Sequence, residues 1–221
     1  MHTLRFLLVM VAGLVFSIVP AQELDLQPKY GVQPKNEAQL AADAAFIAAI
    51  DEQYEGDRRK ASDDIAGRGW QLLRQGNRPE AMKRFNQAWL VDHSSGVALW
   101  GMAVVQSVSG KHDQALRLFS EAERLIGDDI DFAADHAKAV GFAGALTKNK
   151  ALLNDGFSRF SNVFEAAPQH TQNLQNWAMV LYYRGNYAEA WAKVKLAEAT
   201  PRHAELDAKF LAALRNRMPR P

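Results

Sequence analysis

The chain has 221 residues, of which 48% are apolar and 23% are charged, and this balance excludes a wholly disordered protein. Its 26 basic and 25 acidic residues leave a formal charge of +1 with no basic block, so nucleic acid is not an expected partner. The absence of cysteine excludes thiolate metal sites, cysteine nucleophiles and redox switching.

Residues 1–21 are predicted to be a secretory signal peptide. Arg5 precedes an apolar run from Phe6 to Val19, and cleavage is expected after the small residue Ala21. The run is shorter than the about 20 residues of a membrane-spanning helix, although an uncleaved N-terminal anchor is the alternative. No cysteine follows it to accept a lipid. These features predict a periplasmic or secreted bacterial protein that is soluble and has no integral membrane span after cleavage.

The next two segments differ in pattern. Residues 22–35 contain two prolines and a glycine without helical periodicity, which predicts an extended tether. In residues 36–56, apolar side chains recur at steps of three and four, which predicts one amphipathic helix that ends at the Glu55-Gly56-Asp57 turn. The sequence leaves open whether these residues cap the following array or occupy its binding surface.

The remainder of the chain is repetitive. Similar ten-residue segments begin at Gly76, Gly110 and Gly185, and the first two align without a gap 34 residues apart. In each unit a small residue in the first helix is followed twelve residues later by a second small residue, and four residues further by a larger apolar residue. In order, these sets are Gly69, Ala103, Gly144 and Ala178; Ala81, Ala115, Gly156 and Ala190; and Phe85, Phe119, Phe160 and Val194.

This arrangement resembles the tetratricopeptide repeat. The resemblance implies an all-α protein, a right-handed α-solenoid of helix-turn-helix units over residues 57–204. Small residues let two helices approach closely, and the larger residue fills the space toward the next pair. The third unit is the most degenerate, with Ala151 at the position of the turn glycine. The predicted units are 62–95, 96–129, 137–170 and 171–204, with residues 130–136 inserted and residues 205–221 forming a capping helix and tail.

No catalytic, metal-binding or cofactor-binding pattern is found. None of the six histidines is paired with another at the i, i+4 spacing of a helical zinc site. The acidic pairs Asp63-Asp64 and Asp128-Asp129 precede helices, where carboxylates satisfy free backbone N–H groups. A non-enzymatic protein without a cofactor is therefore expected.

The resemblance also implies that the first helices of the units line a concave groove. Aromatic residues concentrate there, and tryptophan and tyrosine are enriched where binding energy is large. The alternative is that the N-terminal helix or the C-terminal cap covers this face and buries Trp70 or Trp100. The predicted peptide-binding groove contains Trp70, Arg74, Trp100, Val104, Lys138, Gln175, Met179, Tyr182 and Tyr183.

Together these patterns predict an exported, non-enzymatic scaffold that binds a protein or peptide segment in the cell envelope. Two alternatives stay open. In the first, the chain is a structural subunit that self-associates into a homo-oligomer. In the second, it is an accessory subunit of an envelope enzyme.

Overall fold

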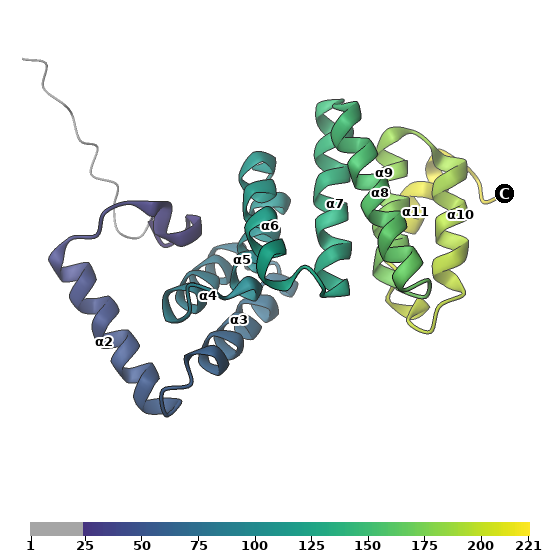
Figure 1. Cartoon of the computed structure of the whole chain (residues 1–221). Helices are drawn as coiled ribbons and strands as arrows, with labels where there is room; N and C mark the ends of the chain where they lie inside the picture. Colours follow the sequence, from purple (N-terminus) through teal and green to yellow (C-terminus); the bar gives the residue numbers. More distant parts are fainter. Residues whose placement is uncertain (1–23) are drawn as a thin grey trace, which may run out of the picture.

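The computed structural model describes residues 24–221, and the predicted signal peptide lies outside them. The described residues form ten α-helices and two 3-10 helices, with no strand (Figure 1). None of these helices combines the length and the apolar character that crossing a membrane requires.

Eight helices form four pairs that stack in chain order, and the predicted all-α solenoid is confirmed (Figure 1). Each pair contributes a first and a second helix. The pairs are α3 (Arg58–Arg74) with α4 (Arg78–Val91), α5 (Gly96–Val108) with α6 (His112–Ile126), α7 (Ile130–Thr147) with α8 (Lys150–Ala166), and α9 (Thr171–Arg184) with α10 (Tyr187–Glu198).

The first helix of each pair ends at a residue in the left-handed backbone conformation, with a positive φ angle. Gly76, Gly110 and Gly185 have φ angles of 80°, 77° and 85°, which glycine adopts without steric strain. In the third pair Lys148 takes this role with a φ of 57°, and Asn149 then caps α8. Aligning the repeats on Phe160 places this turn at Ala151. In the structure the turn lies three residues earlier, and α8 begins correspondingly earlier.

The seven inserted residues are helical. They form the start of α7, where the Asp129 side chain accepts a hydrogen bond from the Phe132 backbone N–H. The rings of Phe132 and His136 lie 5.9 and 5.0 Å from the ring of Phe119 on α6. The insertion thus packs the third pair against the second.

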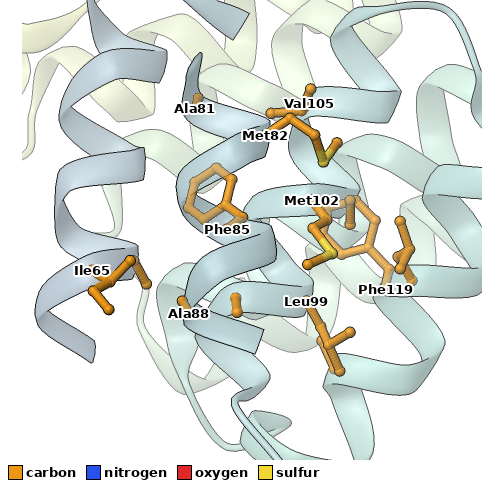
Figure 2. Packing of buried hydrophobic residues seen from close by; sticks show 14 of the residues in the cluster. Ile65, Ala81, Met82, Phe85, Ala88, Leu99, Met102, Val105 and Phe119 are labelled. Carbon is orange, nitrogen blue, oxygen red and sulfur yellow. The ribbon is translucent and has the colours of Figure 1, made fainter. Parts of the chain in front are cut away.

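Large apolar side chains fill the space between the helices of neighbouring pairs. Phe85 is completely buried and lies among Met82, Met102 and other core residues in Figure 2. A Cβ atom added to Gly101 would lie 2.2 Å from the Phe85 ring, so α5 passes against that ring only because it has no side chain there.

Two segments flank the pairs. At the N-terminal end, α2 (Glu37–Gln53) begins with a capping box between Asn36 and Gln39 and stands away from the stacked pairs in Figure 1. The segment expected to be an extended tether instead folds back onto α4 and contains the 3-10 helix η1 (Pro28–Val32). At the other end, η2 (His203–Glu205) precedes α11 (Ala208–Arg217), which packs on α10.

Candidate functional site

The first helices α3, α5, α7 and α9 form the surface that is called the first-helix face below. Trp70 of α3 and Trp100 of α5 lie on it with their ring centroids 4.7 Å apart, edge to face. Trp70 also contacts the buried Phe85 ring at 5.4 Å. Both tryptophans are only partly buried, so they rest on the core while part of each side chain stays accessible to a ligand.

A carboxylate from α7 completes this first cluster. The Trp100 indole N–H donates a hydrogen bond of 3.1 Å to Asp135 Oδ2. Desolvation raises the pKa of Asp135, while Lys138 and the indole act in the opposite direction. Within residues 24–221, Asp135 forms no ion pair. A partly buried carboxylate with one neutral donor therefore lies beside Trp100.

A second aromatic cluster occupies the other end of the first-helix face. Tyr183 of α9 is 56% exposed and contacts Phe142 of α7 edge to face, at 5.0 Å. Its other neighbour is Tyr182, whose ring lies 5.4 Å away. Tyr183 is thus a large, accessible aromatic side chain held in place by two rings.

Two residues of α9 predicted to line the groove, Gln175 and Tyr182, contact the C-terminal cap. Gln175 is only 6% exposed, and its Oε1 accepts a hydrogen bond of 2.6 Å from the Asp207 backbone N–H. The Tyr182 ring lies 6.0 Å from Phe210 of α11, and Met179 packs into the same cluster. The prediction is therefore wrong for Gln175, which the segment before α11 covers, while Met179 and Tyr182 are partly buried.

The remaining predicted residues lie between and beside the two clusters. Arg74 is exposed, and Val104 and Lys138 are partly buried. In the described part of the chain no ring-to-ring contact connects the Trp70–Trp100 cluster with the Phe142–Tyr183 cluster. The structure therefore supports two separate anchor points rather than one continuous aromatic trough.

Asp135 is not among the residues that the sequence predicts for the groove. This residue lies in the inserted segment, outside the repeat pattern, so no repeat position marks it as part of the surface. No sequence signal distinguishes Asp135 from the other polar residues of this stretch, such as Asp131 and Lys138.

A polar network joins α6, α7 and α8 behind this face. Arg159 Nη1 donates to Glu123 Oε1 at 2.7 Å and to His136 Nδ1 at 3.2 Å. Burial, and the positive charge of Arg159, lower the pKa of His136 to about 4. Burial acts to raise the pKa of Glu123, but Arg159 and His136 lower it below its usual value. The histidine is therefore neutral at pH 7 and serves packing and hydrogen bonding.

No metal site is evident among the described residues, where no group of three or more histidine, aspartate or glutamate side chains is arranged to hold an ion. The surface offers aromatic rings, one carboxylate and a few cations. Such a set can bind another polypeptide.

Comparison with known proteins identifies the fold. No protein-family model matches the chain, and no curated protein matches it. A solved thermophilic tetratricopeptide-repeat protein of Thermus thermophilus superposes with a TM-score of 0.63 at 20% identity, covering 72% of this chain and 84% of that one. A solved MamA RS-1 ArsTM double mutant gives a TM-score of 0.47 at 14% identity, covering 73% of this chain and 93% of that one. The likeness to the Thermus protein shows that the chain has the tetratricopeptide-repeat fold.

Proposed function

We propose that this protein is a non-enzymatic scaffold that binds a segment of another protein along its first-helix face. The observation that carries the proposal is the Trp70–Trp100–Asp135 cluster, in which two partly accessible indoles lie beside a partly buried carboxylate. Large aromatic side chains fixed by the core lose little entropy on binding, which favours them as anchors.

The bound segment spans two anchor points in this proposal. One is the Trp70–Trp100 cluster, and the other is Tyr183 with Phe142. Val104 and Lys138, which are partly buried on α5 and α7, lie on the first helices between them. The ligand that suits this layout is a segment with two apolar side chains separated by polar residues.

We also propose that the protein acts in the bacterial cell envelope after export. The support is the apolar run from Phe6 to Val19 with Arg5 before it and Ala21 after it, together with the absence of cysteine. Detection of a mature N-terminus at Gln22 in a periplasmic extract would support export, and an intact Met1 in the cytoplasmic fraction would contradict it.

The binding role is tested by affinity purification from envelope extract. The wild-type chain is compared with a Trp100→Ala, Tyr183→Ala double variant, and proteins retained by each are identified by mass spectrometry. Phe164→Ala is the control, because Phe164 is a partly buried aromatic residue on the second helix α8. We expect the double variant alone to lose specific partners. An identical set of partners for all three proteins would remove the proposed surface from consideration.

A further inference from the structure

A hollow of about 210 Å³ lies where the first helices α7 and α9 end. Its lining divides into two groups. Gly144 and Leu153 are buried, whereas Lys148, Lys150 and Arg184 are exposed. These three side chains are called the cation rim below. The hollow has room for a carboxylate with several waters, because each water occupies about 30 Å³ in the liquid.

The cation rim has no acidic partner within residues 24–221. None of its three side chains takes part in an ion pair or a side-chain hydrogen bond there. The acidic residues early in the adjoining second helices have other partners. Asp155 pairs with Arg159 at 3.2 Å, and Glu189 accepts a hydrogen bond from the Asn186 side chain. The positive charge around the hollow is therefore uncompensated.

Backbone geometry does not account for a lysine at this turn. Lys148 has a φ of 57°, in the left-handed region, and each of the other three pairs has glycine at the corresponding turn. The start of α8 is already capped, since the Asn149 side chain accepts hydrogen bonds from the Ala151 and Leu152 backbone N–H groups. The charge at the hollow thus comes from side chains rather than from a bare helix end.

The hollow adjoins the second anchor point of the first-helix face. Ala145, which lines it, lies one helical turn after Phe142 and packs into the same apolar cluster. Arg184 of the rim directly follows Tyr183, whose ring contacts Phe142. The first anchor point carries the opposite charge, because it contains Asp135. A segment that lies on both anchors therefore meets a carboxylate at one end and three cations at the other.

We propose that the cation rim binds a carboxylate of the protein segment on the first-helix face, next to the apolar side chain that packs on Tyr183. This inference rests on the proposed function and specifies one acidic group in the ligand. Ammonium and guanidinium groups only donate hydrogen bonds, and a carboxylate only accepts them, so the two are complementary. The opposite charge at Asp135 fixes the direction in which the segment lies.

A random library of twelve-residue peptides is the probe for this carboxylate. The library is displayed once with both peptide ends joined to the carrier and once with a free C-terminus, and each form is selected against the full chain. We expect the selected peptides to combine apolar residues with an acidic group. Enrichment of Asp and Glu in both forms assigns the carboxylate to a side chain, and selection confined to free C-termini assigns it to the chain end.

A triple variant decides whether the acidic group binds the cation rim. Lys148→Gly, Lys150→Gln and Arg184→Gln are combined, and the first change suits the left-handed turn, so the variant should fold at least as stably as wild type there. A selected peptide should bind wild type at least about fivefold more tightly than its analogue with amides in place of carboxylates, as two or three exposed ion pairs imply. The triple variant should bind both peptides equally. Lys195→Gln, at an exposed position on α10, is the control and should keep the preference.

The outcomes separate this inference from the proposed function. Selected peptides that lack acidic groups, or that keep their preference for the acidic form in the triple variant, overturn the inference alone. Binding to anionic lipid vesicles that only the triple variant loses, without acid-selective peptides, would assign the rim to a membrane surface and would also overturn it. If no selected peptide loses binding to Trp100→Ala, Tyr183→Ala, the proposed function itself fails.

Discussion

The helices α7 and α8 cross with Gly141 and Gly156 in direct contact. A Cβ atom added to Gly156 would lie 2.5 Å from Gly141 Cα, well inside the separation of non-bonded carbon atoms. Both glycines are buried. The third pair therefore approaches more closely than any side chain at this point would allow, although it is the most degenerate repeat in sequence.

Gly156→Ala should lower the free energy of unfolding by about 1–3 kcal/mol, because the added methyl group forces the two backbones apart. Gly67→Ala is the control. Gly67 lies on an exposed face of α3, where an added Cβ meets nothing within 4 Å, and the change should stabilise the helix by up to about 1 kcal/mol. Urea denaturation measures both variants, and equal effects would contradict the close crossing.

Phe119→Ala should cost about 3–5 kcal/mol of stability, the usual effect of deleting a buried aromatic ring. Phe119 is 1% exposed and stacks on the His136 ring at a centroid distance of 5.0 Å. Leu125→Ala on the same helix removes an exposed side chain and should change stability by less than about 0.5 kcal/mol. A melting temperature of Phe119→Ala close to that of wild type would show that the ring does not join the second and third pairs.

Lowering the pH should lower the free energy of unfolding, and His136 contributes to this effect. The folded state lowers the pKa of this histidine from 6.5 to about 4, so between these values the unfolded chain binds a proton that the native protein does not. The free energy of unfolding therefore falls as the pH falls through this range, by up to about 3 kcal/mol for this one group. The lowered pKa of Glu123 acts in the same direction, because its carboxylate is stabilised by folding.

The comparison that isolates this effect is wild type against His136→Gln, with His93→Gln as the control at an exposed position. Denaturation curves at several pH values should show a flatter pH dependence for His136→Gln only. The same slope in all three proteins would mean that other groups control the acid sensitivity.

Asp135→Asn should stabilise the protein and weaken ligand binding. The raised pKa of Asp135 means that folding disfavours its charge, so a neutral amide that still accepts the Trp100 indole hydrogen bond relieves this penalty. The melting temperature should therefore rise at pH 7, while retention of envelope partners falls. A variant that is less stable than wild type would indicate that the negative charge has a structural partner.

Much of the architecture follows from local sequence. Gly76, Gly110 and Gly185 end helices because glycine alone adopts the left-handed backbone without strain, and the spacing of Phe85 and Phe119 indicates a repeated packing unit. These properties depend on neighbouring residues, so one chain suffices to predict them. The third turn is at Lys148, and repeat alignment places it at Ala151 instead because no glycine marks it.

The candidate surface is less predictable. Repeat position assigns Trp70 and Trp100 to the first-helix face, and the structure brings their rings together there. Gln175, Met179 and Tyr182 are predicted to lie on the same face in the last unit, yet Gln175 is buried under the segment before α11 and Tyr182 contacts Phe210 of α11. Repeat position specifies which way a side chain points but not which later segment packs against it.

The helix pairs and most of the turns between them follow from the amino-acid sequence alone, because backbone preferences and apolar periodicity act within a few residues. Three contacts are visible only in the folded chain: Asp135 with Trp100, the C-terminal cap with Gln175, and Asn86 with residues 25–29. Each of these contacts joins residues at least 32 positions apart. Their formation depends on how complete helices stack, which no local pattern encodes.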